Sequence, residues 1–220
     1  MKFVLTAVMA ISLFAAACED PAANKTKAKV NEPAPNSANT SNTANAVQVA
    51  AKGEAVAING ENSKVEFTGS KVTGKHEGGF KTFTGTIELV NSKPVDSSVT
   101  VYIESASVYV DDEKLATHLK SADFFDVEKF PKATFKSTKI EADAAKGADT
   151  YTVTGDFSLH GVTKSISFPA TIKAAADAVD VDAEFAVNRK DFGIVYAGKA
   201  DDLIRDDVVI KLTLKAPRKK

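Results

Sequence analysis

The chain has 220 residues and a formal net charge of −1, from 28 Lys and Arg against 29 Asp and Glu. This balance offers no excess of basic charge for a phosphate backbone, so nucleic acid is excluded as a partner. A single cysteine rules out an internal disulfide.

The first 17 residues have the form of a secretory signal peptide. Met1 and Lys2 precede the run FVLTAVMAISLF, which is too short to span a bilayer, and the small residues AAA lead to Cys18. Cys18 resembles the lipobox cysteine of bacterial lipoproteins, although Ala15 stands where leucine is usual and AAA also suits ordinary signal peptidase. We therefore expect an exported protein of the periplasm or cell envelope, held at the membrane by a lipid anchor on Cys18, with soluble release as the alternative.

Residues 18–53 are predicted to be a lipidated N-terminus and a disordered tether. From residue 19 to residue 53 the chain is mostly Ala, Asn, Thr, Ser, Pro and Lys, with three valines and no aromatic residue. Such a segment buries too little apolar surface to offset its conformational entropy. The folded domain is then residues 54–217, which is long enough for a substantial core.

Alternation of apolar and polar residues with a period of two runs through this domain and predicts β-strands. The pattern is clearest at 151–159, where Val153, Phe157 and Leu159 share one face. Loss of the alternation near Ser105 predicts a bulge there. The expected strands are 55–58, 64–69, 81–89, 98–108, 133–140, 151–159, 164–173, 179–188 and 207–215.

This pattern predicts an all-β fold, a closed antiparallel eight-stranded barrel with one short helix near the mouth. Closure is expected because it removes the exposed strand edges of an open sheet; a two-sheet sandwich is the alternative. Asp111 or Asp112 can cap the helix, and Leu115, His118 and Leu119 fall on one stripe at helical spacing.

The stretch HLKSADFFDVEKFPKATF, residues 118–135, places aromatic rings between the helix and the next strand. Phe124, Phe125 and Phe130 follow neither the helical nor the strand period. They either plug an open end of the barrel as a satellite core or form the lip of an internal cavity.

The segment HLKSADFFDVEKFPKATFKSTKI closely resembles the central signature of the YceI-like family. These are exported bacterial proteins, lipocalin-like in shape, that bind polyisoprenoid or other amphiphilic lipids. The segments GGFKTFTGTIEL, SVTVYIESASV, YTVTGDFSLHGVTKSISF and AVNRKDFGI resemble the remaining blocks in family order. The resemblance covers about residues 55–216 and implies a lipocalin-like barrel that holds a lipid.

The composition is consistent with an oily interior. Without the two phenylalanines of the signal peptide the chain keeps 11 Phe, with four Tyr and no Trp. At about 0.3 kcal/mol per heavy atom, a forty-carbon tail yields about 12 kcal/mol of binding free energy. We expect no cofactor and a cavity lined by Phe67, Phe83, Ile87, Leu115, His118, Leu119, Phe124, Phe125, Phe135, Val153, Phe157, Phe168 and Phe185.

The leading hypothesis is non-enzymatic binding, sequestration or transport of an isoprenoid or similar amphiphilic lipid. Neither a metal site nor a nucleophilic set is predicted, because His76, His118 and His160 have no metal-ligand spacing. The alternative is an envelope protein–protein interaction module with a filled barrel, docking through Phe124 and Phe125. An enzyme ranks third and would require the histidines to converge on one carboxylate. A homodimer stays open.

Overall fold

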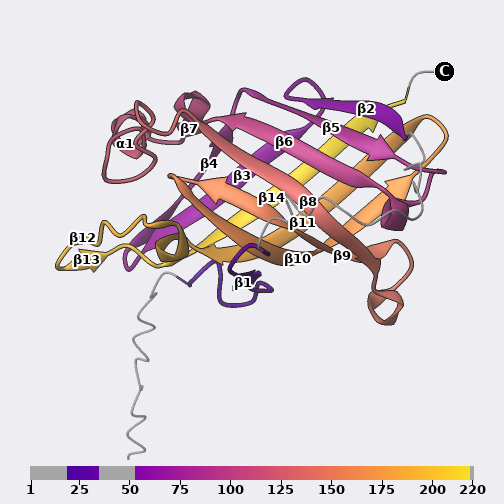
Figure 1. Ribbon diagram of the computed structural model, residues 1–220. Coiled ribbons are helices and arrows are strands. Elements are labelled where there is room, and N and C mark those ends of the chain that lie inside the picture. Colours follow the sequence, from indigo (N-terminus) through magenta and orange to yellow (C-terminus); the bar gives the residue numbers. More distant parts are fainter. Residues whose placement is uncertain (1–18, 35–52, 219–220) are drawn as a thin grey trace, which may run out of the picture.

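The computed structural model describes residues 19–34 and 53–218, which form a curled β-sheet with one α-helix at one end (Figure 1). The helix is α1 (Glu113–Leu119), and the longer strands all surround one interior. The strands are β1 (Lys29–Asn31), β2 (Glu54–Asn59), β3 (Lys64–Lys71), β4 (Gly74–Phe80), β5 (Phe83–Leu89), β6 (Ser98–Glu104), β7 (Val108–Val110), β8 (Lys132–Ala142), β9 (Thr150–Leu159), β10 (Val162–Ala174), β11 (Ala178–Asn188), β12 (Gly198–Lys199), β13 (Asp202–Leu203) and β14 (Asp207–Pro217).

The strands of the large sheet are hydrogen-bonded in the order β2-β5-β6-β8-β9-β10-β11-β14-β3-β4-β7, and every adjacent pair is antiparallel. The last strand of this path, β7, follows its third strand, β6, in the chain after a short 3₁₀ turn, so the two ends of the path lie near each other. β2 also packs against β14. The sheet therefore wraps around an interior, as a lipocalin-like wall does.

The all-β fold with one helix is confirmed, but the closed eight-stranded barrel is wrong. The hydrogen-bonded path is an open one that ends at β2 and β7. The physical reason is that two long strands are broken: residues 81–82 separate β4 from β5, and the 3₁₀ turn Ser105–Ser107 separates β6 from β7. The predicted irregularity near Ser105 is this second break.

The sequence pattern did not predict β4, whose sequence is GKHEGGF. Glycine is depleted in strands, so propensity opposes this element. The structure requires glycine here: a Cβ on Gly78 would lie 2.3 Å from the carbonyl oxygen of Tyr109 and 2.9 Å from Cζ of Phe67. Close packing between neighbouring strands decides this position.

The segment 19–34 is ordered against the sheet, and the prediction of a disordered tether is wrong for these residues. β10 and β11 pair only near one end, from residues 171–174 to residues 179–182. β1 fills the gap beyond: Lys29–Asn31 pairs with β10, while the amide of Ala28 donates to the carbonyl of Ala186 at 2.8 Å. Backbone hydrogen bonds to the open edges of β10 and β11 hold this segment in place. Amino-acid composition gives no information about such bonds.

The remaining residues of the predicted leader and tether, 1–18 and 35–52, lie outside the described residues, and Cys18 is among them.

The core follows the inner face of the curl, and a second cluster lies beneath α1. Val108, Leu119, Phe124 and Ile194 form this second cluster, all less than 9% exposed. The helix begins at Asp112, whose carboxylate accepts a hydrogen bond from the amide of Leu115 at 2.9 Å. This N-cap, which the sequence analysis predicted, fixes where α1 starts over the end of the sheet.

Candidate functional site

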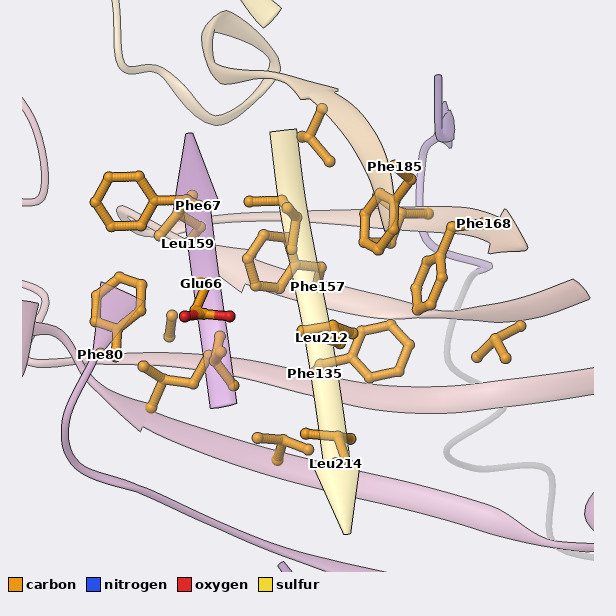
Figure 2. A pocket seen from close by; sticks show the side chains of 18 of the residues that line it. Glu66, Phe67, Phe80, Phe135, Phe157, Leu159, Phe168, Phe185, Leu212 and Leu214 are labelled. Atoms are coloured by element: carbon orange, nitrogen blue, oxygen red, sulfur yellow. The ribbon is translucent and has the colours of Figure 1, made fainter. Parts of the chain in front are cut away.

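A cavity of about 260 Å³ lies inside the curl of the sheet (Figure 2). Strand alternation builds its wall: on β9 the side chains of Val153, Phe157 and Leu159 face it, while those of Ser158 and Thr154 pair with polar groups on β10. β14 contributes every second residue in the same way. The surface that faces the cavity is therefore aliphatic and aromatic almost throughout.

Aromatic rings divide this interior. Phe168 and Phe185 are stacked, with ring centroids 4.2 Å apart and planes at 11°. Phe135 lies 5.7 Å from Phe168, and Phe157 meets Phe192 edge to face at 5.1 Å. Figure 2 shows Phe135, Phe157, Phe168 and Phe185 inside the pocket, and they come from the successive strands β8, β9, β10 and β11 of one wall. Rings are flat and turn about χ2, so the shape of the space between them can change without loss of the sheet.

The aromatic stretch after α1 faces inward. Phe124 is 7% exposed, and Phe125 meets Phe80 edge to face at 5.6 Å between centroids. Phe80 in turn lies 5.9 Å from Phe67. Phe130 is not part of this group, because its ring packs against His160 at 5.1 Å. The two adjacent phenylalanines thus close the helix end of the cavity from within.

Most of the predicted cavity residues lie in its wall, and three do not. Phe83 is buried in the core at the start of β5, Leu115 packs in the cluster under α1, and His118 turns toward Asp123. Phe83 and Leu115 pack on the inner side where neighbouring side chains fill the space, whereas His118 lies on the flank of α1. The ten in the wall are Phe67, Ile87, Leu119, Phe124, Phe125, Phe135, Val153, Phe157, Phe168 and Phe185.

Several wall residues were not predicted as site residues. Phe80 ends the glycine-rich strand β4, while Ile194 and Ile204 lie on the loop between β11 and β14, where no alternation marks them. Others, such as Leu212 and Leu214, were expected to face inward but not to bound a cavity. Regular alternation identifies the inner face of a strand, but it does not reveal which part of that face stays unfilled.

One cation, Arg189, lies at the cavity wall, and its donors are taken by the protein. Its Nη1 donates to the carbonyl of Ile194 at 2.7 Å, its Nε to that of Arg205 at 3.1 Å, and its Nη2 meets Asp206 at 3.3 Å. Burial lowers the pKa of Arg189, and the nearby Asp206 acts in the opposite direction. Arg189 therefore fastens the loop between β11 and β14.

A second hollow, of about 290 Å³, is lined by charged and polar residues that include Glu66, Tyr109, Glu184 and Lys211. Glu66 also belongs to the wall of the first cavity, where it is the one carboxylate among the lining residues (Figure 2). Burial raises the pKa of Tyr109, and the charge of Glu66 adds to this shift. The backbones of Glu66 and Lys211 face each other across β3 and β14. These mixed charges do not form a set that would activate a nucleophile or a water molecule.

The three histidines do not converge. His76 Nδ1 lies 2.8 Å from Asp111, and His118 Nε2 lies 2.7 Å from Asp123. His160 occupies a turn with φ of 51° and its Nδ1 lies 3.2 Å from the carbonyl of Phe192. Each imidazole thus has a partner of its own.

Among residues 19–34 and 53–218, no three His, Cys, Asp or Glu side chains are gathered as a metal site would require. In the same ranges, no helix has the length and apolar character needed to cross a bilayer.

Known proteins are similar to this chain over the same region. The YceI-like domain family matches residues 57–216. A UPF0312 protein of Pseudomonas putida strain W619 is 34% identical over 140 residues, which are 61% of this chain and 71% of that protein. A UPF0312 protein of Pseudomonas fluorescens strain SBW25 matches to the same extent.

Two solved structures share the fold. BcnA of Burkholderia cenocepacia has a TM-score of 0.62 at 25% identity, over 70% of this chain and 96% of that one. A polyisoprenoid binding domain from Saccharophagus degradans has a TM-score of 0.59 at 16% identity, over 76% of this chain and 100% of that one. At 16% identity, the likeness to the Saccharophagus degradans domain shows a shared fold and nothing more.

Proposed function

We propose, from the premise that the chain belongs to the YceI-like domain family, that it binds an isoprenoid or similar amphiphilic lipid in its interior cavity. The protein then acts as a non-enzymatic carrier or store of that lipid in the bacterial cell envelope. The observation that carries this proposal is the cavity of about 260 Å³ with a wall of aliphatic and aromatic side chains. The polyisoprenoid binding domain of Saccharophagus degradans, which has the same fold, supports the choice of ligand class.

The apolar wall favours a hydrocarbon chain over a polar ligand. Polar ligands need several buried donors and acceptors, and the one buried cation of the wall, Arg189, has its donors directed to carbonyl oxygens. A hydrocarbon tail needs only removal from water, worth up to about 0.8 kcal/mol per CH₂. Chain length and the fit of the rings would then set the specificity.

The ligand proposal includes a change in the rings. A volume of about 260 Å³ is slightly below the range of about 300–1,000 Å³ found for sites of drug-sized ligands. A long tail would therefore displace side chains such as Phe157 and Phe125, which both line the space. Rotation of such rings about χ1 and χ2 leaves the backbone ladder intact.

A protein-binding module with a filled interior is less well supported. That function needs aromatic rings presented to solvent, whereas Phe124 is buried and Phe125 packs against Phe80. An enzyme is also less well supported, since each histidine has a separate partner. Non-enzymatic lipid binding therefore requires no catalytic groups beyond the apolar wall that the cavity has.

The location of the protein is part of the proposal. A signal peptide over residues 1–17 and diacylation of Cys18 would hold the domain at a membrane of the envelope. Labelling with radioactive palmitate tests the anchor: the native chain should incorporate label and a Cys18→Ser variant should not. Equal labelling of both chains would exclude this anchor.

The decisive experiment for the ligand has two parts. Lipids extracted from the protein purified from its host should contain an isoprenoid by mass spectrometry, and titration with geranylgeraniol should saturate. The absence of both would overturn the proposal.

A pair of variants tests whether the cavity is the site. Phe157→Asp places a charge in the apolar wall and should abolish geranylgeraniol binding, because a carboxylate without a partner is costly in such surroundings. Phe157→Leu keeps the wall apolar and should bind within about tenfold of the native chain, a difference of about 1.4 kcal/mol. Circular dichroism checks that both fold. If Phe157→Asp binds geranylgeraniol as the native chain does, the cavity is not the site.

A further inference from the structure

Exposed apolar side chains lie on the turn between β3 and β4 and on the segment between β11 and β14. Val72, Val195 and Leu203 are 53%, 65% and 49% exposed, and we call them the apolar tip. Val72 lies in the turn between β3 and β4, and its amide donates to the carbonyl of Leu203 on β13 at 3.2 Å. Val195 lies on the segment that leads into β12. Figure 1 shows the β12–β13 hairpin at the same end as α1 and away from β2.

Hydrogen bonds and an ion pair of Asp202 hold the β12–β13 hairpin against the β3–β4 turn. The Asp202 carboxylate accepts hydrogen bonds from the amide of Thr73 at 3.1 Å and from its hydroxyl, and it forms an ion pair with Lys71. These contacts fasten the hairpin to the turn. The exposure of Val72 and Leu203 is therefore a property of a tied structure, and apolar side chains gathered in this way mark an interaction surface.

The inner side of the tip is the wall of the cavity. Ile194 and Ile204, the immediate neighbours of Val195 and Leu203, both line it, as does Gly69 just before the β3–β4 turn. At Val195 and at Leu203, the exposed residue of the tip is directly bonded along the chain to a residue of the cavity wall. A partner bound at the tip would thus be adjacent to the site of the lipid.

The beginning of the described chain is fastened at the base of the same tip. Asp20 Oδ2 lies 3.5 Å from Nη1 of Arg205, whose amide donates to the carbonyl of Ser70 at 2.9 Å. Ala22 is 2% exposed and packs with Ala186 and Val209 on the outer face of the sheet. The chain that precedes residue 19, which carries Cys18, is therefore joined to the fold at this end.

We infer that the apolar tip docks on the surface of a lipid bilayer, so that this end of the cavity faces the membrane and an isoprenoid passes between bilayer and cavity without crossing water. The inference rests on the proposed lipid-binding function. An anchor on Cys18 would act at the same end, and it would place the tip and the cavity wall together at the membrane.

The charge near the tip determines what kind of docking to expect. Residues 71–75 and 195–206 carry four basic and three acidic side chains. Attraction to anionic lipids grows with the number of unopposed basic residues, so it contributes little here. Docking should depend on insertion of the apolar side chains and should occur on vesicles of neutral phosphatidylcholine.

Tryptophan fluorescence tests the docking directly, because the chain contains no tryptophan. Leu203→Trp places a reporter at the tip, and Val95→Trp is its control, since Val95 is 45% exposed near the other end in the β5–β6 connection. With the full mature chain on vesicles containing brominated phosphatidylcholine, the Leu203→Trp variant should be quenched strongly and the control weakly. Equal quenching of the two variants would overturn the inference.

Lipid transfer separates the docking from the lipid-binding function. The double variant Val72→Asn with Leu203→Asn should take up geranylgeraniol from vesicles about tenfold more slowly, since two apolar side chains no longer insert. Its equilibrium affinity for geranylgeraniol in solution should match that of the native chain. Tyr102→Asn, on the outer face of β6, serves as the surface control.

The outcomes are distinguishable. Native uptake by the double variant, with normal affinity, would overturn the docking inference and leave the lipid-binding function in place. Quenching of the Leu203→Trp variant in a chain that binds no geranylgeraniol would overturn the function and leave the docking in place.

Discussion

At the scale of single residues, Arg189 has a structural role that the sequence pattern does not indicate: its buried side chain bonds several backbone carbonyls. Its side chain is 5% exposed and lies at the end of an apolar cavity, where a charge without partners would be costly. The guanidinium avoids this cost because it donates to the carbonyls of Ile194 and Arg205 and meets Asp206. A planar group with five donors can satisfy several oxygens at once.

Replacement of Arg189 should therefore destabilise the protein. Arg189→Leu leaves several carbonyl oxygens without a donor and should lower the free energy of unfolding by about 3 kcal/mol. Arg189→Lys should recover only part of this, because an ammonium cannot reach the same oxygens in one plane. Urea unfolding followed by circular dichroism measures both. A Leu variant as stable as the native chain would contradict this role.

At the scale of elements, β4 depends on its glycines. Gly79 faces Tyr109 on β7, and a Cβ on it would lie 2.6 Å from the carbonyl oxygen of Val65. β4 therefore packs closely between β3 and β7, and its adjacent glycines, which have no side chain, permit this close approach. Glycine is the cause both of the low strand propensity of β4 and of the close approach of the neighbouring backbones.

Two alanine substitutions on β4 should differ sharply. Gly78→Ala would place its Cβ 2.3 Å from a backbone oxygen and should cost about 3 kcal/mol of unfolding free energy. Gly74→Ala is the matched control, since nothing lies within 4 Å of its Cβ position, and it should change stability by no more than about 0.5 kcal/mol. Thermal denaturation of the two variants provides the comparison. Similar melting temperatures would show that β4 can move away.

The helix α1 should respond to acid through its N-cap. The hydrogen bond from the Leu115 amide, the largest cause, lowers the pKa of Asp112 below its usual 3.8. A carboxyl with a lowered folded pKa contributes stability above its unfolded pKa, and this contribution is lost as the pH falls through the lower folded value. α1 should therefore fray as the pH drops below 3.8.

Amide hydrogen exchange at Leu115 and Ala116 measures this fraying. Asp112→Asn keeps an oxygen acceptor and does not titrate, so its protection should not change over the same pH interval apart from intrinsic exchange. A native chain whose protection is equally independent of pH would contradict the assignment.

At the scale of the whole molecule, the curl of the sheet creates the cavity. β1 closes the wall where β10 and β11 diverge, and its Val30 and the preceding Ala28 pack against the core. Aromatic side chains of neighbouring strands pack together at centroid distances such as 4.2 Å for Phe168–Phe185 and 5.9 Å for Phe67–Phe80, and a cavity remains beside them. The interior is therefore neither solid nor an open channel lined by polar groups.

A series of isoprenoid alcohols should report the size of this space. At about 0.3 kcal/mol per heavy atom, each five-carbon unit adds about 1.5 kcal/mol, so affinity should rise about tenfold from geraniol to farnesol and again to geranylgeraniol. The increase should stop when the displaced rings can move no further. Calorimetric titration gives the constants, with Phe157→Asp as the control. A constant affinity across the series would exclude binding of the tail inside the cavity.

Alternation along the chain predicted most strands and the inner faces that carry Phe135, Phe157 and Phe168, and Asp112 is one of the two helix caps that the sequence offered. These depend on local periodicity, which the sequence contains directly. The same reasoning placed Phe83 and His118 in the wall, where they are not. A residue at a strand start can satisfy the period and lie in a filled part of the core, and one on a helix flank can bond a neighbouring side chain instead.

The sequence by itself determined the all-β character of this protein and its oily inner face, because side-chain order sets strand periodicity and burial. Its place among YceI-like domains follows from the match of residues 57–216 to that family. Only the tertiary structure decided the strand breaks, the glycine strand β4, the insertion of β1 between β10 and β11, and the apolar tip beside Arg205. Each of these arises from backbone groups or surfaces distant in sequence that meet only when the sheet curls.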